Sequence, residues 1–323
     1  MAIKSINIGS FTVFRDYEMK FSSGVNILNG KNGVGKTHML KLLYTGVSKD
    51  AYAQFDSAHK TDGTGIAGYH VVSEIGAGAF GVERAELDNN NLYWMDFEEE
   101  NFSANQAVYI PPKDILSHAR GLPAMKKKYG SNMPFEAPLI DIIEASQAWN
   151  LNEPSPLAKE IASALEAVMD GTVEVKDDGS FWIKKRNGRL IPFSMEAEGV
   201  KKFGLLWKLL MNEGIKENSI VLWDEPENGV HPEVFPVLVN AVLALQRQSV
   251  QFIIATHSYN FVRYFDVLKK ENDKVCHYIL FKDENGYTKY SQADDFVGLT
   301  PNPIDDAGEQ LYKDVISRAI RGV

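Results

Sequence analysis

The residues with the clearest chemical potential form a glycine-rich loop that ends in a lysine and a threonine. The stretch Gly30-Lys31-Asn32-Gly33-Val34-Gly35-Lys36-Thr37 lies between an apolar segment and a run with helical spacing. Backbone N–H groups of such a loop, together with a helix N-terminus, surround phosphate groups. We expect Lys36 to reach the β- and γ-phosphates of ATP and the Thr37 hydroxyl to bind Mg²⁺. The predicted nucleotide-binding residues here are Asn29, Gly30, Asn32, Gly33, Val34, Gly35, Lys36, Thr37 and His38.

Two further polar positions follow apolar, strand-like runs later in the chain. Asp224 and Glu225 follow residues 220–223, and His257 follows residues 252–256. We expect Asp224 to join Thr37 as a Mg²⁺ ligand, and Glu225 to orient or deprotonate the water that attacks the γ-phosphate. An imidazole at His257 can donate to that phosphate. An Asp-Glu pair or a histidine alone is common in solvated loops, so the interpretation depends on their combination with the glycine-rich loop. The predicted catalytic residues are Glu225, His257 and Lys36.

The spacing of apolar residues indicates the elements that hold these groups. Alternation over residues 1–21 predicts an antiparallel β-ribbon, and residues 219–255 read as strand, helix and strand, which implies a parallel sheet. We expect an α/β fold and one ATPase domain over residues 1–323. Its predicted parts are the ribbon and glycine-rich loop (1–45), an inserted β-rich arm (46–106), a helical insertion with a hairpin (107–190), the catalytic core (191–265) and a C-terminal extension (266–323).

Composition narrows the classes of protein. The chain has 323 residues, of which 44% are apolar, enough for a packed core. Its 34 basic and 43 acidic residues give a net charge of −9, which argues against a surface that coats nucleic acid. Two basic clusters, around Lys126 and Lys184, fit either solvated charge or contact with nucleic acid or an acidic partner. The single cysteine and the absence of a long apolar run predict a cytoplasmic protein without membrane insertion.

The motifs resemble those of ABC-type ATPases, and among them the soluble SMC-like and OLD-like "AAA family ATPase" branch (AAA_21-like) found in prokaryotic phage-defence systems. The resemblance rests on the opening Ile-x-x-Ile-x-Ile pattern, on Trp223-Asp224-Glu225-Pro226-Glu227-Asn228 with His231-Pro232, and on Ala255-Thr256-His257-Ser258. It covers residues 1–45 and 190–265. It implies a P-loop NTPase head of the ABC type with an N-terminal antiparallel β-subdomain and a helical insertion.

The same resemblance implies a head-to-tail dimer that sandwiches ATP between the glycine-rich loop of one copy and a signature loop of the other. The candidate signature loop is residues 193–202, in which Glu198 and Gly199 stand at a predicted helix start. Its residues differ from the usual Leu-Ser-Gly-Gly-Gln. The glutamates in this loop would place negative charge near the γ-phosphate, which is also an anion. The glutamine of a Q-loop is also missing after residues 107–110, where Pro111-Pro112-Lys113-Asp114 stands.

Three functions fit these observations. The first is an ATP-driven switch that controls a separate effector, such as a nuclease or toxin, in a defence-type system. The effector is expected on another polypeptide, because residues 266–323 are too few for a nuclease domain. The second is the ATPase subunit of a membrane transporter, which the N-terminal ribbon and the altered signature loop disfavour. The third is a nucleotide-dependent scaffold with negligible turnover.

Overall fold

The fold is organised around a six-stranded sheet with the order β12-β11-β3-β10-β9-β5. The computed structural model describes residues 2–47, 69–73, 107–129 and 135–320, so most of the predicted arm at 46–106 lies outside the described residues. Five neighbouring strands are parallel, and β12 at one edge is antiparallel to β11. The strands are β5 (Ala107–Ile110), β9 (Ile220–Asp224), β10 (Gln251–Ala255), β3 (Val25–Gly30), β11 (Val275–Lys282) and β12 (Thr288–Ala293).

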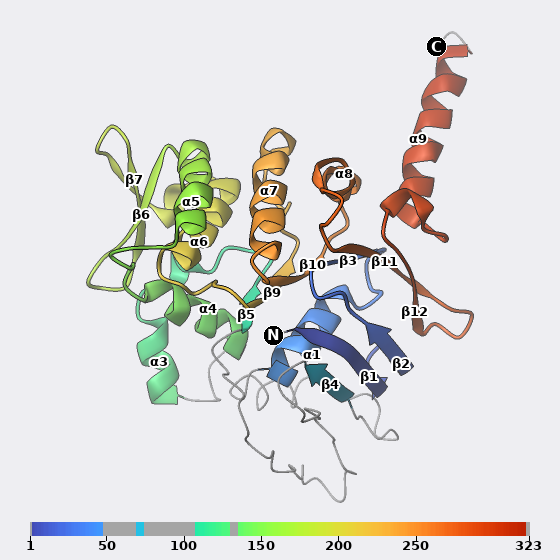
Figure 1. Cartoon of the computed structure of the whole chain (residues 1–323), viewed down its shortest axis with the longest axis horizontal. Coiled ribbons are helices and arrows are strands. Elements are labelled where there is room, and N and C mark those ends of the chain that lie inside the picture. The colour runs from blue at the N-terminus through green and yellow to red at the C-terminus, as the bar shows by residue number, and fades with distance from the viewer. Residues whose placement is uncertain (1, 48–68, 74–106, 130–134, 321–323) are drawn as a thin grey trace, which may run out of the picture.

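Helices cover both faces of this sheet (Figure 1). Side chains of β3 alternate between the faces, so that Ile27 packs in one hydrophobic cluster and Leu28 in the other. The first cluster contains residues of α5, α6, α7 and α8, and the second contains residues of α1 and of β1 and β2. The helices are α1 (Lys36–Val47), α3 (Leu122–Tyr129), α4 (Ala137–Gln147), α5 (Pro156–Met169), α6 (Glu198–Met211), α7 (Phe235–Gln246), α8 (Tyr259–Leu268) and α9 (Pro303–Ile320).

Two smaller antiparallel sheets flank the central one. The first has the order β2-β1-β4 and is formed by β1 (Ile3–Phe11), β2 (Phe14–Lys20) and β4 (Tyr69–Ser73). The second has the order β6-β7-β8 and is formed by β6 (Gly171–Val175), β7 (Phe181–Lys185) and β8 (Leu190–Pro192). Among the described residues, no helix combines the length and the apolar character that crossing a membrane requires.

The structure confirms the predicted α/β fold with a parallel sheet and an N-terminal antiparallel β-ribbon. It differs from the sequence reading after residue 265. The strand β11 lies between β12 and β3, so the segment predicted as a C-terminal extension supplies two strands of the central sheet. The helix between β9 and β10 begins at Phe235, because residues 232–234 form a 3-10 turn with a proline in its first position.

One buried side chain joins the N-terminal ribbon to the central sheet. Gln251, the first residue of β10, is fully buried. Its Oε1 accepts from the Ile3 N–H at 2.7 Å, and its Nε2 donates to the carbonyls of Ile3 at 2.9 Å and Ser22 at 2.8 Å. These bonds satisfy backbone groups at the start of β1 and just after β2. The ribbon is therefore fastened to the sheet by polar contacts as well as by apolar packing.

We predict that Gln251→Leu lowers the free energy of unfolding by about 2–4 kcal/mol, because it leaves buried backbone groups without partners while keeping most of the volume. Urea unfolding followed by circular dichroism measures the change. Gln248→Leu, at an exposed position in the turn before β10, is the control and should change stability little. Equal stability of the two variants would show that the three hydrogen bonds of Gln251 contribute nothing.

Candidate nucleotide site

The glycine-rich loop connects the end of β3 to the start of α1, and two of its glycines are required by close packing. Gly30 has φ of 144°, and a Cβ there would lie 2.3 Å from the Leu280 carbonyl oxygen. Gly35 has φ of 97°, and a Cβ there would lie 2.6 Å from the Val13 side chain. Larger residues are therefore excluded at both ends of the turn. The loop is held between β11 and the ribbon, with its chain direction leading into the α1 N-terminus.

Lys36 is the first residue of α1, and its side chain folds back over the loop. Its Nζ donates to the carbonyls of Gly30 at 2.8 Å and Lys31 at 3.1 Å. Burial lowers the pKa of Lys36, while the nearby carboxylates of Asp224, Glu225 and Glu227 act in the opposite direction. The ammonium group is therefore close to the backbone curve in which the phosphates of a nucleotide would lie.

Thr37, at the start of α1, and Asp224, at the end of β9, form a direct pair. The Thr37 hydroxyl donates to Asp224 Oδ2 at 2.8 Å, although the two residues are 187 positions apart. Asp224 is 2% exposed, and burial raises its pKa, with a further contribution from the negative charge of Glu225. A hydroxyl and a carboxylate are oxygen ligands that Mg²⁺ prefers, and a cation would relieve the cost of the buried charge. The donor set therefore fits a magnesium ion.

Glu225 and His257 also meet at this edge of the sheet. His257 Nδ1 lies 3.2 Å from Glu225 Oε1, and both side chains are partly exposed. The Glu225 backbone has φ of 46° and is held by its N–H, which donates to the Ala255 carbonyl at 2.8 Å. A left-handed conformation is unusual for glutamate and indicates a backbone fixed by its surroundings.

A third carboxylate, Glu227, shapes the turn that carries His257. Its Oε1 accepts from the Thr256 hydroxyl at 2.6 Å and from the His257 N–H at 3.2 Å. Glu227 is 7% exposed, and its Oε2 has no hydrogen-bond partner among the described residues. The sequence reading gave Glu227 no role in the site. The feature of the sequence that could have indicated such a role is that Glu227 stands three residues after Asp224.

The other residues predicted to bind nucleotide around the loop differ in their burial and in their contacts. Asn29 is buried and its Oδ1 accepts from the Gly30 N–H at 2.8 Å, which shapes the entry to the loop. Val34 is buried and its carbonyl accepts from the Thr288 hydroxyl of β12 at 2.8 Å. His38 Nδ1 lies 3.1 Å from the Thr12 hydroxyl in the ribbon. Asn32 and Gly33 are exposed at the tip of the loop.

The predicted signature residues lie at the beginning of α6. Glu198 is exposed and pairs with Lys201 at 2.7 Å, and Lys201 also lies 3.4 Å from Asp114. Gly199 packs against the loop that follows β9, since a Cβ there would lie 2.8 Å from the Gly229 carbonyl oxygen. The described contacts of Glu198 and Gly199 are thus with their own helix and with this loop, rather than with the glycine-rich loop of the same copy.

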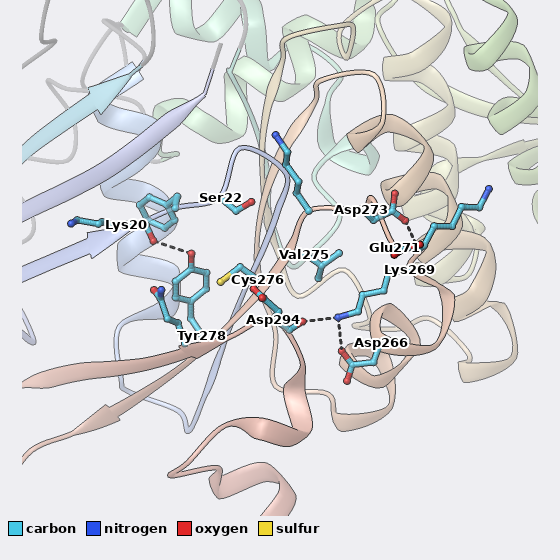
Figure 2. A pocket seen from close by; sticks show the side chains of 14 residues that line it. Lys20, Ser22, Asp266, Lys269, Glu271, Asp273, Val275, Cys276, Tyr278 and Asp294 are labelled. Carbon is cyan, nitrogen blue, oxygen red and sulfur yellow. Dashed lines mark hydrogen bonds and ion pairs between the residues drawn. The ribbon is translucent and has the colours of Figure 1, made fainter.

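A separate cavity of about 610 Å³ lies at the opposite edge of the sheet, near the first residues of β11 (Figure 2). Tyr278 donates there to the Lys20 carbonyl at 2.9 Å, and Lys269 donates to the Asp294 carbonyl at 2.6 Å. Figure 2 shows acidic side chains, among them Asp266 and Asp273, beside the lysines of this cavity. Its charges are balanced within the chain, so phosphate chemistry is better supported at the edge that carries Lys36.

Comparison with known proteins identifies the family. Residues 68–263, more than half of the chain, match the family described as "AAA domain, putative AbiEii toxin, Type IV TA system". The chain belongs to this AAA-domain family. The matched region contains β9, β10, α6 and His257, and it begins after the glycine-rich loop.

One curated relative matches the chain over a shorter stretch. The chain is 35% identical over 141 residues to the DNA replication and repair protein RecF of Heliobacterium modesticaldum. The alignment covers 40% of this AAA-domain chain and 36% of RecF, so the chain spans little more than a third of that relative's length.

Solved structures share the fold at low sequence identity. The SMC head domain from Thermotoga maritima matches with a TM-score of 0.50 and 15% identity, covering 91% of this chain and 99% of that one. An SmcHead bound to the C-winged helix domain of ScpA matches with a TM-score of 0.59 and 12% identity, covering 91% and 98%. The AAA-domain chain therefore has the fold of SMC-type P-loop ATPase heads.

Lys202 of α6 is a buried charged residue in this site that the sequence reading did not single out. It is 6% exposed, and its Nζ donates to the main-chain carbonyl of Glu225. Burial lowers the pKa of Lys202 to about 8, against the opposing effect of the carboxylates of Glu227, Glu225, Asp224 and Glu198. Lys202 stands directly before Phe203 in the sequence. Residues 201–210 of this helix are all buried in the structure.

This lysine predicts a specific pH dependence of stability. Below about pH 8 Lys202 is protonated in the folded and the unfolded chain, and between 8 and its ordinary value of 10.5 only the folded chain loses the proton. Because the unfolded chain then binds more protons, stability rises with pH over this window. The free energy of unfolding of the wild type, minus that of Lys202→Met, should therefore increase by up to about 1.4 kcal/mol per pH unit above pH 8.

Urea unfolding at several pH values between neutral and moderately alkaline measures this difference. Lys216→Met, at an exposed position before β9, is the matched control, and its difference from wild type should not change over the same window. A flat difference for Lys202→Met as well would contradict the buried position of this ammonium group.

Proposed function

We propose that this AAA-domain chain binds ATP with Mg²⁺, hydrolyses it, and uses the cycle to switch a dimer that controls a partner effector. The observation that carries the proposal is the meeting of Lys36, the Thr37–Asp224 pair and the Glu225–His257 pair at one edge of the parallel sheet. Transfer of a phosphoryl group to water needs a loop that surrounds the phosphates, ligands for the metal ion and a base. These residues provide a candidate for each part. In open α/β sheets this edge is also where ligands bind.

Nucleotide binding would use contacts that the loop already makes within itself. The Lys36 ammonium group donates to two backbone carbonyls, and phosphate oxygens would replace these as acceptors. Thr37 and Asp224 would hold Mg²⁺, which neutralises charge on the β- and γ-phosphates when bound. Backbone N–H groups of the loop and of the α1 N-terminus supply the remaining positive potential.

Hydrolysis would depend on Glu225 and His257. The Glu225 carboxylate would orient the attacking water and accept its proton, so that the water oxygen bonds to the γ-phosphorus as the bond to the ADP oxygen breaks. In the protonated form of His257 both ring nitrogens would donate, Nδ1 to Glu225 and Nε2 to a γ-phosphate oxygen. Glu227 supports this arrangement, because it binds the His257 N–H and the Thr256 hydroxyl.

A second copy would complete the site through the start of α6. Glu198 is exposed there, and Gly199 packs on the loop that follows Glu225. The same helix carries Lys202, which binds the Glu225 carbonyl. Docking of a nucleotide from another copy against the α6 N-terminus would thus act on the backbone that positions Glu225. The arrangement supports a head-to-tail dimer in which ATP lies between the two copies.

The proposed setting is cytoplasmic and defence-type, with a toxin or nuclease as the effector. The family description reads "putative AbiEii toxin, Type IV TA system" for the AAA domain itself, which favours a toxin-type system but does not name a separate effector. RecF is described as a DNA replication and repair protein, which raises direct DNA contact as an alternative. The basic clusters give that alternative little support, because Arg120, Lys126 and Lys184 each pair with acidic residues of the same chain.

We expect Lys36→Ala to weaken ATP binding by at least about 100-fold, because the substitution removes a charge-assisted contact to the phosphates. Titration of a fluorescent ATP analogue with Mg²⁺ measures the affinity. Lys31→Ala, in the same loop but exposed, is the matched control and should bind within a few-fold of wild type. Equal affinity of both variants and the wild type would place the nucleotide elsewhere.

We expect Glu225→Gln to reduce ATP turnover by about 100-fold or more while ATP binding remains, because an amide cannot accept the proton of the water. The ATP-bound dimer should then accumulate, and phosphate release together with mass in solution measures both effects. Glu233→Gln, at an exposed glutamate beyond the same loop, should behave as wild type.

Each other outcome identifies a different function. Wild-type ATP binding without turnover, unchanged by Glu225→Gln, would indicate a nucleotide-dependent scaffold. Turnover that arises only with a copurifying membrane protein would indicate a transporter ATPase subunit. Turnover that survives Glu225→Gln would remove this residue from the mechanism.

A further inference from the structure

The hairpin formed by β11 and β12 contacts both ends of the glycine-rich loop. At the first end, the carbonyl oxygen of Leu280 in β11 lies so close to Gly30 that a Cβ there would be only 2.3 Å away. At the second end, the hydroxyl of Thr288, the first residue of β12, donates to the Val34 carbonyl at 2.8 Å. This hairpin lies outside residues 68–263, which match the AAA-domain family.

Thr288 is itself held in place by the N-terminal ribbon. It is fully buried, and its N–H donates to the carbonyl of Val13, in the turn between β1 and β2, at 2.9 Å. The neighbouring residue adds a second contact with the ribbon, because the Tyr287 hydroxyl accepts from the Arg15 guanidinium at 2.6 Å. A buried β-branched side chain with a fixed backbone has little rotational freedom. The Thr288 hydroxyl is therefore a fixed donor to the loop.

The hydrogen bond of Thr288 sets the orientation of one peptide unit of the loop. The Val34 carbonyl and the Gly35 N–H belong to the same planar trans peptide, so they point in opposite directions. Because the carbonyl is turned toward β12, the Gly35 N–H is turned away from β12. Gly35 has φ of 97° and no side chain to restrict it, so a glycine backbone at this position could turn more easily than others. An external bond is what holds this peptide in one orientation.

We propose that Thr288 is a positioning residue for the nucleotide site, whose hydroxyl holds the Val34–Gly35 peptide so that the Gly35 N–H is directed at a phosphate oxygen of the nucleotide. This inference rests on the proposed function, since the ligand is the phosphate chain of ATP. Thr288 acts through the backbone of the loop and does not touch the nucleotide. A loop that is ordered before binding loses less conformational entropy when the ligand binds, which raises the affinity.

The first test is the affinity of the full chain for a fluorescent ATP analogue with Mg²⁺, at a temperature where circular dichroism shows every variant to be folded. Thr288→Val keeps the shape of the side chain and removes the hydroxyl, and should weaken binding by about 10-fold. Thr288→Ser keeps the hydroxyl and should bind within about 3-fold of the wild type. Ser291→Ala is the matched control, because it removes a hydroxyl of β12 that has no hydrogen-bond partner among the described residues.

The second test needs no nucleotide. Amide hydrogen exchange of residues 31–37 in the nucleotide-free chain should be faster by about 10-fold in Thr288→Val, because the peptide before Gly35 is then free to turn. Thr288→Ser and Ser291→Ala should exchange like the wild type in this segment. Exchange in β10, in the interior of the central sheet, should be the same in all variants, which separates an effect on the loop from a general loss of stability.

The outcomes separate this inference from the proposed function. If Lys36→Ala binds ATP as tightly as the wild type, the proposed nucleotide site is wrong and the role of Thr288 falls with it. If Lys36→Ala weakens binding while Thr288→Val binds like the wild type, the site stands and only the role of Thr288 is overturned. Binding by Thr288→Ser as weak as that of Thr288→Val would also overturn it, because the hydroxyl would then not be the cause. Unchanged exchange of the loop in Thr288→Val would do the same.

Discussion

The arrangement of the site depends on one constraint, the parallel register of β3, β10 and β9. Leu28 pairs with Ala255, and Ala255 pairs with Asp224, so the three chain segments leave the sheet at the same level. Backbone bonds continue the alignment beyond the strands, since Thr256 N–H donates to the Leu28 carbonyl and Glu225 N–H to the Ala255 carbonyl. A slip of one residue would turn Asp224 to the other face and remove it from Thr37. Side-chain contacts at this edge thus follow from hydrogen bonds made in the interior of the sheet.

Within this frame α6 is the element that connects the surface of the protein to the candidate nucleotide site. Its exposed start carries Glu198, its middle is buried from residue 201 to residue 210, and Lys202 binds the backbone of Glu225. A buried ammonium group is costly unless it is paired, and here it is surrounded by acidic side chains of the loop after β9. The unusual backbone of Glu225 is therefore held from both sides, by Ala255 through its N–H and by Lys202 through its carbonyl. The backbone of Glu225 and the helix α6 are thus joined within one packed interior, which resists deformation.

The parts that could be predicted from sequence are those specified locally. The limits of β10 follow from its apolar run, and the glycine-rich loop, Asp224 and His257 follow from residue types placed next to strand ends. The parts that could not be predicted depend on contacts between distant segments. The position of β11 between β12 and β3 requires a pairing across about 250 residues of chain, and short apolar strands do not encode their neighbour. The buried positions of Gln251 and Lys202 are likewise set by the ribbon and by the loop after β9. A polar residue in an apolar pattern indicates that some partner exists, but not which one.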